Sequence, residues 1–243
     1  MATPRIYTEQ PLYLDQPSVV LNEAASHHLC KVMRLTCGAK LTLFNGLGGE
    51  YSATLNRTGK KAEISLEGFD PIDRESPLSI HLAIGISRSD RMDTVIQKAT
   101  ELGVTRITPL VSERVQGNRK PSQLIKKTER WQSVMLSACE QSGRTRLAII
   151  HAPIRFSEWL CDEPCGEKIF LQPSAQSIDS AFRSATPSSI TIAIGPEGGW
   201  APNEQVELEQ RGFSGVGLGP RILRTETAPL AILALCQARW GDI

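Results

Sequence analysis

Two segments near the end of the 243-residue sequence carry residue types that hold a ligand through backbone contacts. The first is GPEGG, from Gly195 to Gly199, and the second is LGPRILR, from Leu218 to Arg224. Each follows an apolar run with strand character. Glycine lets a backbone approach a flat or extended ligand closely, and proline stiffens the loop around it. Two such loops predict a binding site, with ordinary turns as the alternative interpretation.

The kind of ligand is narrowed by two motifs that the sequence lacks. There is no G-x-G-x-x-G after a first strand and no G-x-x-x-x-G-K-[ST], so the usual dinucleotide and triphosphate cradles are missing. Adenine and ribose can be held by backbone groups of glycine-rich loops, with a few placed polar atoms for specificity. A nucleoside-like ligand with little phosphate therefore fits better.

The elements that must position these loops fall into two segments with different sequence patterns. Residues 1–72 contain short strand-like runs separated by turn-rich pieces such as NGLGG and RTGKK, which is typical of hairpins in a small barrel or sandwich. Asn22 is a plausible N-cap for one helix among them. The predicted strands are Ser18–Leu21, Lys40–Phe44, Glu50–Asn56 and Ala62–Phe69.

The second sequence pattern begins after the polar segment DRESP, and we place a domain junction at residue 73. Strands and helices then alternate to the end of the chain, which predicts a mostly parallel sheet with helices on both faces. Taken alone, this pattern predicts an unknotted doubly wound sheet, because threaded chains are rare. The predicted strands are Leu78–Ser87, Ile107–Val111, Leu147–Ile150, Lys168–Leu171, Ser189–Ile194 and Gly215–Leu218, and the predicted helices are Arg88–Leu102, Ser122–Cys139, Phe156–Cys161, Asn203–Arg211 and Thr227–Trp240.

Composition excludes several classes of protein. With 40% hydrophobic and 22% charged residues the chain is a folded globular protein, and its longest apolar stretch is far shorter than the roughly 20 residues that span a bilayer. Six scattered cysteines favour a reducing cytoplasm. His151, Cys161 and Cys165 are a weak metal-ligand pattern, so we expect no metal. The net charge is only +1, but basic residues gather around residues 114–130, 144–146 and 221–224, which suits either a solvated face or a few phosphate contacts.

Several motifs, taken together and in order, resemble the RsmE family of ribosomal RNA methyltransferases. The motifs are GPEGGW, LGPRILRTETA, QKATELGV, RITPL with SER, ACEQSGR and the early His28-x-x-x-Val32-x-Arg34, and the resemblance runs from about residue 4 to the C-terminus. It implies a PUA-like RNA-binding β-barrel over residues 1–72 and a SPOUT α/β methyltransferase domain over residues 73–243. A deep trefoil knot is implied over about residues 168–240. The resemblance further implies a cytoplasmic homodimer joined through the knot region, with S-adenosylmethionine bound in the knot.

The activity that the resemblance implies is methylation of N3 of a uridine in 16S ribosomal RNA. This reaction needs removal of the imide proton and stabilisation of the negative charge that develops on the pyrimidine. Glu226 and Glu197 are the candidate proton acceptors, with helix capping as their alternative role and solvent as an alternative acceptor. Arg224 and Arg221 are candidates for steadying the anion or a phosphate, unless they pair with acidic neighbours.

Binding residues follow from the same resemblance. RNA contacts are expected from Arg5, Lys31, Arg34 and Arg144. Cofactor contacts are expected from Leu171, Gln172, Ile194, Gly195, Pro196, Glu197, Gly198, Gly199, Leu218, Gly219, Ile222, Leu223, Thr225 and Ala228.

Three other functions remain open at this point. The target could be another ribosomal or transfer RNA nucleotide, because the loops identify the cofactor better than the substrate. The chain could be a non-catalytic RNA-binding factor in ribosome assembly, against which two intact loop motifs argue. A small-molecule enzyme of the doubly wound type would leave the RNA-binding barrel unexplained.

Overall fold

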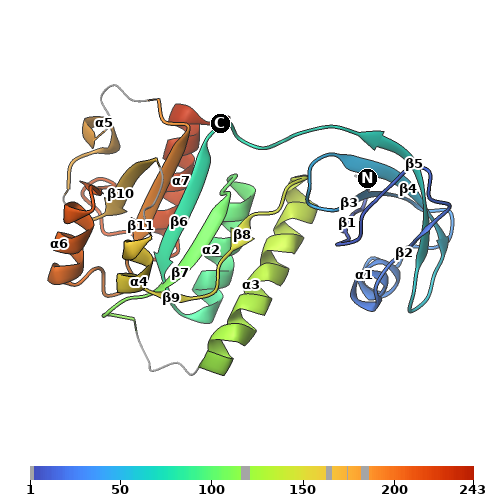
Figure 1. The fold of residues 1–243 in the computed structure, drawn as a ribbon, viewed down its shortest axis with the longest axis horizontal. Coiled ribbons are helices and arrows are strands. Elements are labelled where there is room, and N and C mark those ends of the chain that lie inside the picture. The colour runs from blue at the N-terminus through green and yellow to red at the C-terminus, as the bar shows by residue number, and fades with distance from the viewer. Residues whose placement is uncertain (1–2, 116–120, 163–165, 174, 182–185) are drawn as a thin grey trace. The chain divides into compact units, whose positions relative to one another are not determined.

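The structure is a computed structural model that describes residues 3–115, 121–162, 166–173, 175–181 and 186–243. By their contacts these residues form two compact units. The first unit contains Met1–Glu75 together with Leu136–Leu147, and the second contains Ser76–Met135 together with Ala148–Ile243. Figure 1 shows that each unit is built on its own sheet.

Five strands form the sheet of the first unit: β1 (Arg5–Tyr7), β2 (Val19–Val20), β3 (Lys40–Phe44), β4 (Glu50–Arg57) and β5 (Glu63–Asp70). Their order is β1-β3-β4-β5-β2, with β1 parallel to β3 and the other neighbours antiparallel. Alternate residues of the strands face one core, which includes Ile6, Leu43, Leu55 and Ile64. This alternation is the period-2 pattern of a sheet with one buried face.

Between β2 and β3 the chain forms a helical segment that differs from the single helix we predicted. Asn22 caps α1 (Glu23–His27) as predicted, since its side chain accepts a hydrogen bond from the backbone N–H of Ala25 at 2.9 Å. The segment then continues as a π-helix, η1 (His28–Val32). A single wide turn of this kind is often found at functional sites.

The second unit contains a seven-stranded sheet with strands β6 (Ser79–Gly85), β7 (Arg106–Val111), β8 (Ile149–Ile150), β9 (Ile154–Arg155), β10 (Glu167–Leu171), β11 (Ser189–Ile194) and β12 (Ser214–Val216). Their order is β12-β10-β11-β6-β7-β8, and β9 pairs with β7. All of these pairings are parallel, as predicted. The carboxyl ends of β12, β10 and β11 therefore lie side by side.

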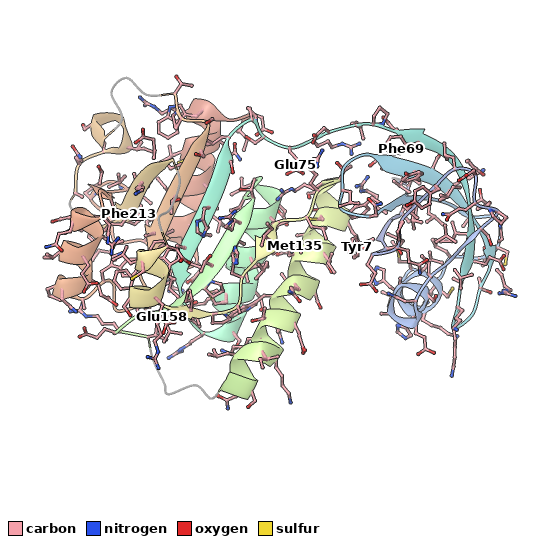
Figure 2. The ribbon with its side chains drawn as sticks, in the orientation of Figure 1. Tyr7, Phe69, Glu75, Met135, Glu158 and Phe213 are labelled. Carbon is pink, nitrogen blue, oxygen red and sulfur yellow. The ribbon has the colours of Figure 1, made fainter. Side chains whose placement is uncertain are left out.

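The helices of the second sheet's connections are α2 (Ser89–Glu101), α3 (Pro121–Ser142), α4 (Phe156–Cys161), α5 (Ile178–Ala181), α6 (Pro202–Gln210) and α7 (Thr227–Trp240). Aromatic residues of α4 pack with Leu208 of α6 and with Phe213 against the sheet. Figure 2 shows the side chains of both units and labels Phe213. Helices α2 and α7 pack on each other. Strand β11 is buried along nearly its whole length, which is the pattern of a strand covered on both faces.

Most predicted elements are confirmed within a few residues, but the short elements β1, β9 and α5 were missed. Gly103 follows α2 with a φ of +78°, as expected for a glycine just beyond a helix end. The contacts also place Leu136–Leu147 with the first unit, although the sequence pattern assigned these residues to the second. Within that unit, the backbone N–H of Tyr7 donates to Glu140 at 3.0 Å and Arg74 donates to the Gly143 carbonyl at 2.9 Å.

Candidate active site

The candidate site lies at the carboxyl ends of three adjacent strands of the second unit. The chain leaves β11 through GPEGG, leaves β12 through LGPRILR, and leaves β10 at Leu171 and Gln172. The carboxyl ends of parallel strands lie at one edge of the sheet, so these three loops meet at that edge. Open parallel sheets bind their ligands at this edge.

The GPEGG loop is a tight turn whose shape depends on glycine. The backbone N–H of Gly199 donates to the carbonyl of Pro196 at 2.8 Å, and Gly199 has a φ of +68°, in the left-handed region that glycine adopts without strain. A Cβ at Gly195 would lie 2.9 Å from the carbonyl carbon of Gly199. The two ends of the loop are therefore closer than any side chain would allow.

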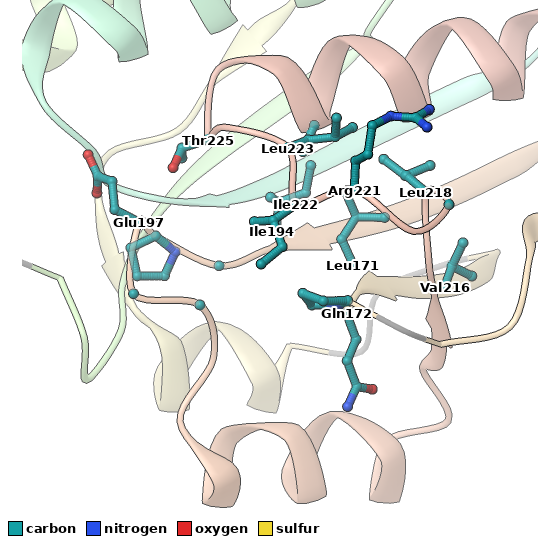
Figure 3. Close-up of a pocket in the computed structure, with 17 residues that line it drawn as sticks. Leu171, Gln172, Ile194, Glu197, Val216, Leu218, Arg221, Ile222, Leu223 and Thr225 are labelled. Carbon is teal, nitrogen blue, oxygen red and sulfur yellow. The ribbon is translucent and has the colours of Figure 1, made fainter.

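Between the three loops lies a pocket with a volume of about 280 Å³. Every residue predicted to contact the cofactor lines this pocket, and Pro173, Val216 and Arg221 line it as well. Figure 3 shows Glu197 and Thr225 toward one end, and Leu218 and Val216 toward the other. The walls are mostly aliphatic, with glycine backbone between them, which suits a flat, weakly polar group with a charged end.

A buried carboxylate and an arginine connect the region of the GPEGG loop to the segment that follows β7. Glu204 is only 3% exposed and accepts hydrogen bonds from the backbone N–H groups of Ala201 and Glu113, both at 2.9 Å. Arg114 donates to the carbonyl of Gly198 at 2.9 Å. Because Glu113 and Arg114 follow β7, these bonds link the segment after β11 to the connection that leaves β7.

The two candidate proton acceptors share one guanidinium that sequence reasoning missed. Arg91 of α2 places Nη1 3.4 Å from Glu197 Oε1 and Nε 3.6 Å from Glu226 Oε2. All three side chains are less than a third exposed. The backbone N–H of Arg88 also donates to Glu197 at 3.3 Å. The available signal was the position of Arg91 just beyond the carboxyl end of β6, the edge at which the ligand loops gather.

The other two predicted catalytic residues are exposed. The Arg224 side chain is 79% exposed, and its Nη1 lies 4.0 Å from Glu226 Oε1. Arg221 lines the pocket, but Figure 3 shows its guanidinium directed away from the pocket's centre. In the described part of the chain, no carboxylate lies within ion-pair distance of Arg221. Both arginines are therefore accessible to a large anionic ligand.

Two of the four predicted RNA contacts are instead committed to structural pairs in the first unit. Arg144 is only 4% exposed and forms an ion pair with Glu75, so its guanidinium is engaged within the first unit, and its contact with RNA stays a prediction. Arg5 pairs with Glu50 and donates to the carbonyl of Arg144 at 3.0 Å. Burial alone would raise the pKa of Glu50, but hydrogen bonds from Arg74 and Arg5 hold that pKa below its ordinary value. Lys31 and Arg34 are exposed.

The weak metal pattern gains no support. Among the described residues, no group of three or more His, Cys, Asp or Glu side chains could hold a metal ion. Cys165 and the basic residues Arg119 and Lys120 lie outside the described residues. Within the same ranges, none of the helices has the length and apolar character needed to cross a bilayer.

Family models match both parts of the chain. The model described as an RNA methyltransferase domain matches residues 74–237, and that described as an RNA methyltransferase PUA domain matches residues 21–67. The chain is also 33% identical to Ribosomal RNA small subunit methyltransferase E of Buchnera aphidicola from Acyrthosiphon pisum, over 98% of this chain and 94% of the relative. The corresponding protein of Synechocystis is 35% identical over 94% of this chain and 75% of its own length.

Solved structures agree with these relatives. A Ribosomal RNA small subunit methyltransferase E from Neisseria gonorrhoeae, crystallised with S-adenosylmethionine, is 38% identical with a TM-score of 0.91. A Legionella pneumophila protein described as a methyltransferase, also in complex with S-adenosylmethionine, is 35% identical with a TM-score of 0.95. Both comparisons cover all of each chain. The chain therefore belongs to the RsmE family of ribosomal RNA small subunit methyltransferases, and has a PUA domain and an RNA methyltransferase domain.

Proposed function

We propose that the protein transfers a methyl group from S-adenosylmethionine to N3 of a uridine in small-subunit ribosomal RNA during ribosome maturation in the cytoplasm. One observation carries the proposal: the loops after β10, β11 and β12 enclose a pocket at the sheet edge where parallel α/β sheets bind ligands. The full-length similarity to two proteins crystallised with S-adenosylmethionine supports the choice of cofactor.

The residues that line the pocket fit this cofactor. Its volume of about 280 Å³ is close to the lower end of the roughly 300–1,000 Å³ typical of small-molecule sites. Aliphatic walls at Leu171, Ile194 and Leu223 suit an adenine ring, and Glu197 places a negative charge at one end for a positively charged sulfonium group. When bound, S-adenosylmethionine supplies an electrophilic methyl group. The protein's contribution is to align that group with the attacking nitrogen and exclude water.

The side chains near one end of the pocket can accept a proton from the uracil ring and stabilise its negative charge. Either Glu197 or Glu226 can accept the proton that leaves N3, and Arg91 holds both carboxylates near the pocket. The exposed guanidiniums of Arg221 and Arg224 can stabilise the negative charge on the uracil oxygens or bind an adjacent phosphate. No step in this scheme requires a metal ion.

The finer features of the architecture are part of the same proposal. We place a PUA-like RNA-binding barrel at residues 1–72 and a SPOUT methyltransferase domain at residues 73–243, with a trefoil knot over about residues 168–240. We also propose a homodimer that forms through the knot region. The support is a pair of apolar side chains that are exposed there, Ile222 at 86% and Leu235 at 45%, which a partner subunit would cover. Sedimentation equilibrium of the wild type against an Ile222→Glu, Leu235→Glu variant tests the dimer.

The activity is tested on small ribosomal subunits from cells that lack this protein. Labelled S-adenosylmethionine is added, and the RNA is digested to nucleosides and analysed by mass spectrometry. We expect N3-methyluridine. Label in a different nucleoside would refute the uridine assignment, and cofactor binding with no transfer to ribosomal or transfer RNA would favour a non-catalytic RNA-binding role.

Single-turnover rates of Glu197→Gln and Glu226→Gln identify the proton acceptor. Removing a general base typically lowers the rate by about 10²–10⁴-fold, and it removes the dependence of the rate on ionisation of that carboxylate. Glu207→Gln, an exchange at an α6 carboxylate with no part in the pocket, is the matched control. If both glutamate variants keep the wild-type rate and pH profile, solvent is the acceptor.

A further inference from the structure

Arg91 of α2 contacts both loops that carry the carboxylates of the candidate site. Its Nη1 lies 3.4 Å from Glu197 in the GPEGG loop, and its Nε lies 3.6 Å from Glu226, which directly follows Thr225 of the pocket wall. Figure 3 shows Glu197 and Thr225 toward the same end of the pocket. Arg91 itself does not line the pocket. Any part that it has in the reaction therefore acts through the two glutamates.

The carboxylate of Glu197 is already engaged by the protein. The backbone N–H of Arg88, the N-cap residue of α2, donates to Glu197 Oε1 at 3.3 Å, and Arg91 Nη1 donates to the same oxygen. The N–H groups at the start of a helix have no partner within the helix, and the side chain of Arg88 makes no capping hydrogen bond. Glu197 therefore caps α2 from a loop 109 residues further along the chain, where the helix dipole favours its charge.

The carboxylate of Glu226 is held in place without being used. Glu226 is the N-cap residue of α7, yet its side chain makes no capping hydrogen bond. Its Oε2 is buried and, within the described ranges, has no hydrogen-bond partner. Arg91 Nε at 3.6 Å from Oε2 and Arg224 Nη1 at 4.0 Å from Oε1 attract the carboxylate, but both are too distant for hydrogen bonds. A buried oxygen without a donor is costly, so this one is suited to a donor that a ligand brings.

We propose that Arg91 is a positioning residue for methyl transfer, which holds Glu226 so that its free Oε2 accepts the proton of uracil N3. Glu197 is the anchor of Arg91 and the cap of α2, and takes no proton. The proposal rests on the proposed function, because it divides that function's chemistry among the residues of the site.

The step balances in atoms and charge. Glu226 receives the N3 proton, N3 keeps the electron pair and forms the bond to the methyl carbon, and the pair of the methyl–sulfur bond stays on sulfur. The negative charge of Glu226 and the positive charge of the sulfonium therefore disappear together. Arg91 is needed because Glu197 and Glu226 would otherwise repel each other.

Variants of the full-length protein test the role of Arg91. Arg91→Met removes the guanidinium, and Arg91→Lys keeps the positive charge. Arg91→Met is also combined with Glu226→Gln and, separately, with Glu197→Gln. The matched control is Lys98→Met, which removes another cation of α2 that pairs with a carboxylate, Glu101 at 2.8 Å, and does not line the pocket.

Three quantities are measured on each variant: the single-turnover rate on small ribosomal subunits that lack the modification, the calorimetric Kd for S-adenosylmethionine, and the melting temperature. Arg91→Met should lower the rate by about 10²-fold, the effect of displacing a reacting group by about 1 Å, with little change in the Kd. Arg91→Lys should recover part of the rate. Lys98→Met should change neither the rate nor the Kd.

The double variants separate positioning from a general loss of structure. Glu226→Gln leaves Arg91 with no proton acceptor to position, so adding Arg91→Met to it should lower the rate by no more than about twofold. Added to Glu197→Gln, Arg91→Met should still slow the transfer strongly, because Glu226 remains the acceptor.

A wild-type rate in Arg91→Met, no recovery in Arg91→Lys, or an equal loss in Lys98→Met would overturn the inference. The same fold loss from Arg91→Met with and without Glu226→Gln would also overturn it, as would a loss of rate matched by a weaker Kd, since Arg91 would then shape the pocket. Failure of the proposed function is distinguishable, because it appears in the wild type as absent S-adenosylmethionine binding or absent methyl transfer to uridine N3.

Discussion

Replacing Gly85 with alanine should distort the pocket that we propose for S-adenosylmethionine, because Gly85 lies against the GPEGG loop. Gly85 is the buried last residue of β6 and does not line the pocket. A Cβ built on it would lie 2.5 Å from the nitrogen of Pro196, 2.6 Å from Pro196 Cδ and 3.0 Å from the carbonyl carbon of Gly195. An ordinary contact is 3.4–4 Å, so the GPEGG loop or β6 must move by about 1 Å. No rotamer change can relieve the clash, because two of the three atoms belong to the backbone.

The size of the effect follows from the cost of overpacking, which is typically about 1–3 kcal/mol. If the loop stays in place, that cost lowers the melting temperature by about 2–4 °C per kcal/mol in a chain of this size. If the loop moves, the cost weakens ligand binding, and about 1.4 kcal/mol corresponds to a tenfold higher Kd. We therefore expect Gly85→Ala to melt several degrees lower, to bind S-adenosylmethionine about tenfold more weakly, or to show both defects in part.

Isothermal titration calorimetry with S-adenosylmethionine and thermal melts with and without it measure both outcomes. Gly68→Ala is the control, because a Cβ there meets one atom within 4 Å, the hydroxyl of Ser52 at 3.2 Å, which can rotate away. If Gly85→Ala matches the wild type in both Kd and melting temperature, the loop is not held against β6 as described. The reasoning that this contact shapes the pocket would then be refuted.

Two further predictions concern stability. Burial, with nearby Arg106 and His151, lowers the pKa of His81 from 6.5 to about 4, so the folded state binds this proton less tightly than the unfolded state. His81 therefore contributes stability above pH 6.5 that is lost as the pH falls toward 4, and the loss amounts to about 3 kcal/mol in all. Urea unfolding measures the free energy of unfolding at pH 7.5 and at pH 4.5. The difference between these two free energies should be smaller in His81→Gln than in the wild type. Arg144→Ala should cost about 3 kcal/mol, because the Glu75 side chain, only 14% exposed, is left without its partner. Urea unfolding should also show that Arg144→Met with Glu75→Leu recovers much of this loss, whereas a main role in RNA binding would lower RNA affinity with little change in stability.

The cofactor loops could be predicted from sequence because their signals are local. A glycine such as Gly199 is needed wherever the backbone takes a positive φ, and a proline such as Pro196 restricts its own φ, so both mark the turn in the sequence itself. The alternation of strands and helices predicted a parallel sheet for the same reason, since hydrophobic periodicity depends on the local backbone. Resemblance to a family then added the cofactor and predicted its contacts.

Charged side chains were harder to place. Arg144 and Arg221 are both arginines beside glycine-containing segments, yet Arg144 is 4% exposed in an ion pair and Arg221 lines the pocket. Which arginine meets an acidic partner depends on residues far away in the chain, as with Glu75 for Arg144. Sequence spacing carries no signal for such pairs.

The sequence by itself therefore determined the order of the elements, the glycine loops and the family. Only the tertiary structure decided that β10, β11 and β12 are neighbours and that Arg91 joins Glu197 to Glu226. The physical reason is one of range. Backbone conformation follows from adjacent residues, whereas strand order and ion pairs are set by contacts between segments that meet only when the chain folds.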